Sequence, residues 1–186
     1  MPNSKGGRGA SKPVAIELLM ADHRKVEELF KQYESKKEDD DESRRDVALQ
    51  VCSELTVHAK VEEELFYPWL RENLDDDDRE MVEEAEVEHQ TAKDLIAQLE
   101  GAEELDATYD AKVKVLSEYI KHHVKEEEEE IFPKVSDMKE ELDELGQEMA
   151  ARKAELMEEL GIEADEPSGK KKPAAGARSG AQPRSR

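Results

Sequence analysis

The sequence predicts an all-α protein, and the fold we expect is an up-down-up-down four-helix bundle with a C-terminal helical extension and a disordered basic tail. Three observations support this prediction. Of the 186 residues, 41% are charged and only 4% aromatic, a composition poor in sheet-forming residues and rich in helix formers. Apolar residues recur at spacings of three and four along four segments. The connections between these segments are short, which favours antiparallel neighbours.

The first helix is predicted over residues 13–35. His23 continues its apolar stripe and is therefore expected to face the core. The other members of the stripe are Ile16, Leu19, Val26, Phe30 and Tyr33. The charged run 36–42 is expected to form a loop.

The second helix is predicted to begin at Ser43, because Asp46 three residues later resembles the second member of a capping box. Its inward stripe also contains polar residues at core positions. The stripe consists of Val47, Val51, Leu55, His58, Glu62, Leu65 and Trp69. Pro68 is expected to bend the helix or to end it near Asn73.

The third and fourth helices complete the predicted bundle. The aspartates 75–78 suit the positive end of the third helix, and Gly101 is expected to stop it. Its stripe consists of Val82, Ala85, His89, Ala92, Ile96 and Leu99. Asp106 is a plausible N-cap for the fourth helix, whose phase turns His123 inward and His122 away. That stripe consists of Tyr109, Val113, Leu116, Ile120, His123, Glu127 and Ile131.

A fifth, highly charged helix is predicted over residues 138–161, closed by Gly161. We expect it to cap the bundle or to pair with another chain. Its apolar residues are Leu142, Leu145, Met149, Leu156 and Leu160. The predicted organisation is therefore a disordered N-terminal tail (1–12), the bundle (13–137), this extra helix (138–161) and a disordered basic tail (162–186).

One motif occurs twice, as H-A-K-V-E-E-E-L-F-Y-P over residues 58–68 and as H-V-K-E-E-E-E-E-I-F-P over residues 123–133. In each copy a histidine precedes a glutamate by four residues, so both side chains share a helix face about 6 Å apart along the axis. A lone inward histidine lies upstream of each copy at a similar separation. The candidate metal ligands are His23, His58, Glu62, His89, His123 and Glu127.

A single inward histidine is more often a hydrogen-bonded core residue than a ligand, but this duplicated set favours a metal. Left unpaired in an apolar core, each polar group would cost roughly several kcal/mol, and neighbouring carboxylates would repel. Imidazole with carboxylate suits iron, manganese or zinc, and six ligands suit two octahedral ions better than one tetrahedral zinc. A ferritin-like site needs two Glu-x-x-His motifs, and only Glu86 with His89 matches, although Glu86 is still expected near the metal.

The composition also indicates which cellular compartment and which classes of binding partner to expect. No apolar run approaches the roughly 18 residues of a membrane span, and the N-terminus lacks a signal-peptide core, so we expect a cytoplasmic protein without a membrane partner. Cys52 is the only cysteine, so metal sites built from several thiolates are excluded. We expect Cys52 to be a small residue of the core. The net charge is −21, while residues 1–12 and 170–186 carry basic residues and no acid. The acidic body should repel nucleic acid, leaving at most weak contact through the tail.

The two motif copies, together with His23 in D-H-R and His89 in V-E-H-Q, resemble the hemerythrin-like, HHE cation-binding family over about residues 13–137. The resemblance implies a non-haem di-iron centre with an oxo or hydroxo bridge, held in the bundle. By the same resemblance, the four histidines would be terminal ligands, and Glu62 and Glu127 would bridge two iron ions.

The sequence departs from the oxygen-carrying hemerythrins at Lys93. Those carriers have a second histidine one turn after the one that matches His89, and Lys93 stands in that place. One iron thereby loses a ligand, which argues against reversible oxygen carriage; Lys93 itself is expected either on the solvated surface or in the site.

We therefore expect a di-iron protein that binds or reduces oxygen, peroxide or nitric oxide, with an unidentified redox partner, as in hemerythrin-like proteins linked to iron handling or oxidant response. The alternatives are a non-catalytic store or sensor of oxygen or iron, and a purely structural bundle whose acidic surface is its working part.

Overall fold

A computed structural model of the chain describes residues 11–36 and 41–162, and every regular element within them is helical. The all-α prediction is confirmed for this part of the chain. The long helices are α1 (Val14–Ser35), α2 (Asp41–Val61), α4 (Asp76–Glu100), α5 (Ala107–Glu126) and α7 (Lys139–Glu159). Two π-helical turns and two short helices extend α2 and α5: η1 (Glu62–Phe66) with α3 (Tyr67–Asn73), and η2 (Glu127–Ile131) with α6 (Phe132–Val135).

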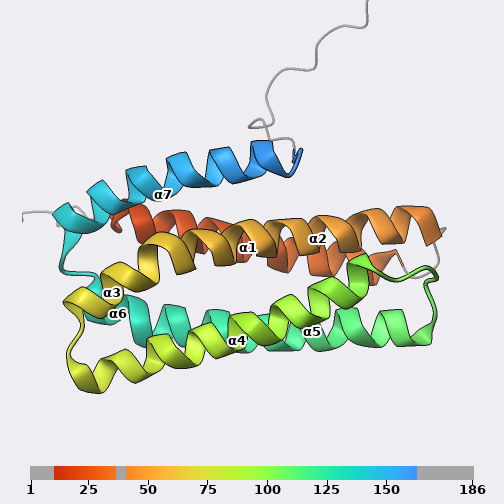
Figure 1. Cartoon of the computed structure of the whole chain (residues 1–186), viewed down its shortest axis with the longest axis horizontal. Coiled ribbons are helices and arrows are strands. Elements are labelled where there is room, and N and C mark those ends of the chain that lie inside the picture. Colours follow the sequence, from red (N-terminus) through yellow and green to blue (C-terminus); the bar gives the residue numbers. More distant parts are fainter. Residues whose placement is uncertain (1–10, 37–40, 163–186) are drawn as a thin grey trace, which may run out of the picture.

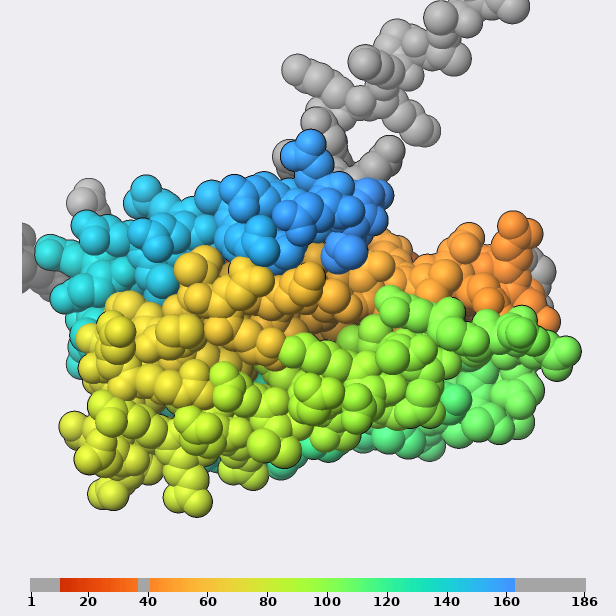
Figure 2. Space-filling model, viewed as in Figure 1, coloured from red at the N-terminus to blue at the C-terminus, as the bar shows by residue number. Residues whose placement is uncertain are grey.

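Four of the long helices lie side by side, each running opposite to the one before it (Figure 1). Contacts join α1 to α2, α2 to α4, α4 to α5 and α5 back to α1, so these helices enclose one core. The fifth long helix, α7, packs on the outside against α1 and α2. In the space-filling view it covers part of one long side of the molecule (Figure 2).

The core consists of two apolar clusters separated by a layer of polar side chains. Along α1, Leu19 belongs to one cluster and Val26 to the other, and His23 lies between them. Along α5 and η2, Ile120 and Ile131 are divided in the same way. The bundle therefore places its buried polar groups near the middle of its length, with apolar packing on both sides.

The predicted stripes of the first, third and fourth helices are buried throughout, but the second stripe is wrong beyond Glu62. Leu65 and Trp69 are only partly buried, and Phe66 is buried instead. The N–H of Tyr67 donates to the carbonyl of Glu62, five residues back, so this turn contains one more residue than an α-turn. The extra residue shifts the phase of every later side chain.

The predicted start of the second helix is also wrong. α2 begins at Asp41, which places Ser43 within its first turn rather than at its N-cap. Acidic side chains in a first turn are favoured by the helix dipole, and the run 41–42 that we expected in a loop supplies them. The predicted cap of the fourth helix is confirmed, because the Asp106 side chain accepts from the Tyr109 N–H at 2.8 Å.

α7 docks closely on α1. A Cβ atom at Gly146 would lie 2.4 Å from the backbone nitrogen of Ala15, so only glycine allows this approach. The helix ends before Gly161, whose φ of 66° is the left-handed conformation that glycine favours. Of the apolar residues named for this helix, Leu160 is 46% exposed, whereas Met157, which was not among them, is buried.

Some predictions lie outside the described residues or are not tested by them. The tails expected at 1–12 and 162–186 fall almost wholly on residues that the structure does not describe. Among the described residues, no helix is long and apolar enough to cross a membrane. Cys52 is a buried core residue as predicted, and burial raises the pKa of its thiol to about 12.

Candidate metal centre

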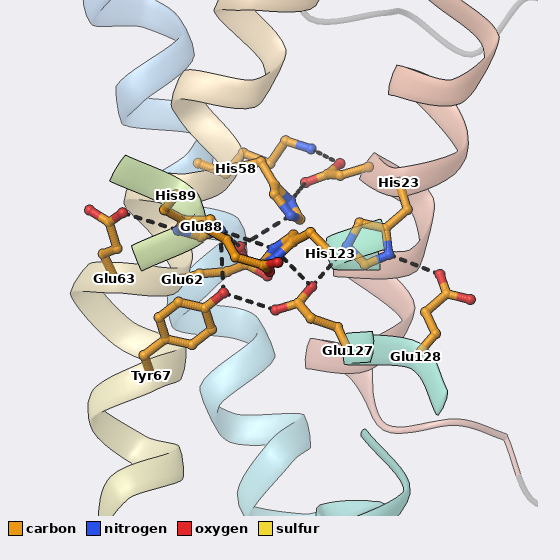
Figure 3. A network of polar contacts seen from close by, with 12 residues as sticks. His23, His58, Glu62, Glu63, Tyr67, Glu88, His89, His123, Glu127 and Glu128 are labelled. Carbon is orange, nitrogen blue, oxygen red and sulfur yellow. Dashed lines mark hydrogen bonds and ion pairs between the residues drawn. The ribbon is translucent and has the colours of Figure 1, made fainter. Parts of the chain in front are cut away.

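The six predicted ligands converge inside the bundle, and each is at most 6% exposed (Figure 3). They come from all four helices of the bundle, and the glutamates are the first residues of the two π-helical turns. His23 and His58 form one pair, with ring centroids 4.9 Å apart, and His89 and His123 form a second pair, 4.7 Å apart. Ligand atoms of the first pair and both glutamates lie within 4.8 Å of one another, as do those of the second pair and Glu62.

Glu62 lies between the two pairs of histidines. Its Oε2 atom is 3.1 Å from Nε2 of His58 and 3.3 Å from Nε2 of His89. One carboxylate can therefore reach a cation held by either pair.

Glu127 has the equivalent position on the other side of the centre. Its Oε2 atom is 3.2 Å from Nε2 of His23 and 3.7 Å from Nε2 of His123. The two glutamates thus each contact one histidine of each pair, an arrangement suited to bridging two cations.

Several inward-facing atoms of the centre have no hydrogen-bond partner. They are Nε2 of His23, Nε2 of His58, both carboxylate oxygens of Glu62 and Oε2 of Glu127. Burial raises the pKa of Glu62 well above its usual value, and the charge of Glu127 adds to this. Burial alone would raise the pKa of Glu127 too, but His123 and His23 hold it below its usual value. These unsatisfied nitrogen and oxygen donors fit a bound cation such as iron, manganese or zinc.

The outward nitrogen of each histidine faces a carboxylate, and we call these four acids the outer carboxylates. The Nδ1 contacts are His23 with Glu128 at 2.8 Å, His58 with Asp22 at 3.6 Å, His89 with Glu63 at 3.0 Å, and His123 with Glu88 at 2.8 Å. A carboxylate at Nδ1 fixes the tautomer and orientation of a ligating imidazole and leaves Nε2 free for the metal. The centre therefore has the second layer of contacts that metal-binding histidines use.

The histidines differ in how readily they take up a proton. Burial lowers the pKa of His58 to about 4, so its imidazole stays neutral near pH 7. Burial also acts to lower the pKa values of His23 and His123, but contact with Glu127 outweighs it and both values are raised.

The structure corrects the role expected for Glu86. Its carboxylate pairs with Arg71 at 2.6 Å, its side chain is 37% exposed, and it belongs to neither group of clustered ligand atoms. Glu88, which the sequence analysis did not select, is buried and contacts His123 instead. The available signal was its position next to His89, because residues beside an inward ligand point toward the neighbouring helix.

Tyr67 is a second residue that sequence reasoning missed. Its hydroxyl donates to Oε1 of Glu127 at 2.9 Å and lies 3.3 Å from Nε2 of His89, on whose ring it stacks. Burial, with the nearby charge of Glu127, raises the pKa of this phenol well above its usual value, so it remains a donor. In an unbroken α-helix Tyr67 would point away from Glu62; the π-helical turn brings it to the same face.

Lys93 was expected either on the solvated surface or in the site, and the structure shows a partly exposed side chain close to the site. Its side chain is 39% exposed, and its ammonium group is 2.5 Å from Glu63, the outer carboxylate of His89. Lys93 also lines a small cavity that the four histidines border. Lys93 therefore contacts the outer carboxylate of His89 and also places an ammonium group beside the cavity.

We predict that the helix phase decides which of two adjacent histidines binds metal. His123→Ala should lose tightly bound metal, because His123 is buried in the centre, whereas His122→Ala should keep nearly all of it, because the His122 side chain is 60% exposed. Metal retained after Fe(II) loading and desalting provides the measurement. The reverse result would show that the phase of α5 is wrong.

We also predict that metal stabilises the fold in a pH-dependent way. A cation at about 1,000 times its dissociation constant adds about 4 kcal/mol, or about 10 °C in melting temperature. His23 and His123 have raised pKa values, so falling pH protonates them early, which blocks ligation and stabilises the metal-free fold. The difference between melts with metal and with chelator should therefore shrink from pH 7 to pH 5. Equal melting temperatures at pH 7 would contradict a core site.

Comparison with known proteins agrees with this geometry. Residues 14–135 match the family model described as the hemerythrin HHE cation binding domain. A DNA nickase from Nostoc sp. (strain PCC 7120 / SAG 25.82 / UTEX 2576) is 26% identical over 150 residues, which cover 80% of this chain and 41% of the nickase. No solved structure matches the chain. With two histidine pairs sharing two glutamates and a family match over most of its length, the chain belongs to the hemerythrin HHE cation-binding domain family.

Proposed function

We propose that this chain is a non-haem di-iron protein that binds or reduces a small oxidant such as oxygen, peroxide or nitric oxide. The observation that carries the proposal is the sharing of both glutamates between two histidine pairs. If each glutamate binds both ions, the six side chains supply about eight of the roughly twelve bonds of two octahedral ions. The remaining positions would be available to a small ligand. Bound iron would supply the electrons for reduction.

The cavity beside the histidines supports a small ligand. It leaves about 20 Å³ free to the centre of a water-sized molecule, and roughly 10–15 Å³ suffices for one such molecule. Besides the histidines, Asp22 and Lys93, its lining is apolar: Val26, Leu55, Ala59, Ala92, Ile96, Ile120 and Val124. A cavity of this size and polarity suits a diatomic molecule or peroxide and leaves no room for an organic substrate.

Residues of the chain around the cavity have separate roles in this proposal. The apolar side chains limit the water next to the oxidant. Tyr67 holds a proton beside Glu127 and can keep that carboxylate oriented. Lys93 places a positive charge at the cavity wall, which favours ligands that gain negative charge on reduction.

DNA nicking is not part of the proposal. The similarity covers 41% of the nickase, and the activity in its name belongs to that whole protein. The net charge of this chain is −21, which opposes approach to a phosphate backbone.

We predict that the protein binds about two iron ions per chain, because six inward ligands are arranged as two pairs with two shared glutamates. Elemental analysis after anaerobic Fe(II) loading and desalting tests this number. A reproducible value near one, or preferential binding of a single zinc ion, would exclude a di-iron centre.

We predict that the di-ferrous protein oxidises quickly in air and that Lys93→His slows this oxidation, because an imidazole one turn after His89 would fill an open position. Since the change also removes the contact of Lys93 with Glu63, Lys93→Met serves as the matched control without a new ligand. Stopped-flow spectra after mixing with oxygen compare the three proteins.

Two outcomes would count against this assignment. Equal oxidation rates for Lys93→His and Lys93→Met would mean that residue 93 does not reach the metal. Oxygen uptake by the wild type that lasts minutes and reverses under vacuum would instead favour an oxygen store or sensor without turnover.

A further inference from the structure

A lysine on the docking face of α7, outside the matched family region, contacts one of the outer carboxylates of the centre. α7 spans Lys139–Glu159, whereas the family match ends at residue 135. The ammonium group of Lys153 contacts Oδ1 of Asp22, and Oδ2 of the same carboxylate is 3.6 Å from Nδ1 of His58. The three side chains form a continuous path from the added helix to a predicted ligand.

Lys153 occupies a position where an apolar residue would be expected. The docking face of α7 is formed by Leu142, Leu145, Gly146, Met149 and Leu156. Lys153 lies four residues after Met149 and three before Leu156, on this face, and its side chain is only 19% exposed. Burying a lysine among apolar neighbours is costly unless its charge is paired, and Asp22 provides the pairing.

Asp22 is, with Glu88, the most buried of the outer carboxylates, and Lys153 pairs with its second oxygen. Its side chain is 9% exposed, and its distance to the histidine it serves, 3.6 Å, is the longest of the four. Neither ring nitrogen of His58 has a hydrogen-bond partner. The contact with Lys153 on the other carboxylate oxygen therefore offsets much of the cost of keeping Asp22 inside the bundle.

We propose that Lys153 is a positioning residue for the metal centre: it holds Asp22 against His58 and thereby couples docking of α7 to metal binding at the pair of His23 and His58. The inference rests on the proposed metal-binding function. Coupling between two events is reciprocal, so bound metal must strengthen the docking of α7 as much as docked α7 strengthens metal binding. The extension thus becomes part of the site rather than a cover on its surface.

Metal titration of three variants tests the forward coupling. Lys153→Met keeps the length and apolar stem of the side chain but removes its charge. Co(II) serves as the probe, because its absorption spectrum reports the ligands of each bound ion. Lys153→Met should weaken binding of one of two Co(II) ions by about ten-fold, in the lower part of the range seen when outer contacts of metal ligands are lost.

Two matched variants separate positioning from simple packing. Lys153→Arg restores a cation and should recover most of the affinity and the spectrum. Arg152→Ala removes the neighbouring cation, which pairs with Glu64 on an exposed surface, and should leave both unchanged. If Lys153→Met does not fold, Asp22→Asn tests the same contact from the other side, with the same expected loss.

Hydrogen exchange tests the reverse coupling. Metal loading of the wild type should slow exchange in the C-terminal half of α7, and Lys153→Met should abolish this protection. Wild-type affinity and spectrum in folded Lys153→Met, or an equal loss in Arg152→Ala, would overturn the inference while leaving the metal site intact. Wild-type protein that binds neither Co(II) nor Fe(II) would overturn the proposed function and this inference together.

Discussion

The stability of the bundle depends on offsetting the free-energy cost of the polar and charged groups buried in its core. Four imidazoles and two carboxylates occupy the layer between two apolar clusters, and several of their inward atoms have no hydrogen-bond partner. Unpaired groups at this depth oppose folding, and two close carboxylates such as Glu62 and Glu127 resist carrying full charge together. A bound cation would pair the unsatisfied atoms and also reduce the repulsion between the two carboxylates. The ligand atoms of this layer accordingly point toward the centre of the bundle.

Each outer carboxylate links its own helix to a histidine on a neighbouring helix. Each lies next to a predicted ligand in the chain but contacts a histidine of another helix; Asp22 follows this rule beside His23, and Glu63 beside Glu62. Adjacent residues on a helix are about 100° apart, so the neighbour of an inward residue faces the next helix. The four contacts run from α1 to α2, from η1 to α4, from α4 to α5 and from η2 back to α1. A closed ring of contacts therefore sets the positions of the four helices relative to the ligands.

Periodicity predicted the fold class and placed the six candidate ligands in one buried layer, because their phase follows from long, regular stripes. It failed at the first of the two π-helical turns. The turn that begins at Glu62 holds an extra residue, so Leu65 was placed inward in error and Tyr67 was missed. The motif contains a physical reason for the wider turn: Pro68 cannot donate to the carbonyl four residues back, and its ring would clash there. The position of Glu88 beside His89 is a signal in the sequence, but which neighbouring helix Glu88 faces follows only from the assembled bundle.

The two halves of the bundle have equivalent positions around the histidines, but the residues at these positions differ in their polar groups. Tyr67 and Phe132 both follow their motif glutamate by five residues, and they stack on His89 and His23 respectively. Only the tyrosine offers a hydroxyl, and it directs that donor to Glu127. Lys93 pairs with Glu63 on the same side, beside His89. The Tyr67 hydroxyl and the Lys93 ammonium group therefore both lie near His89. Two metal ions bound in this framework would have unequal surroundings. The groups suited to a ligand that gains negative charge would lie beside the pair of His89 and His123.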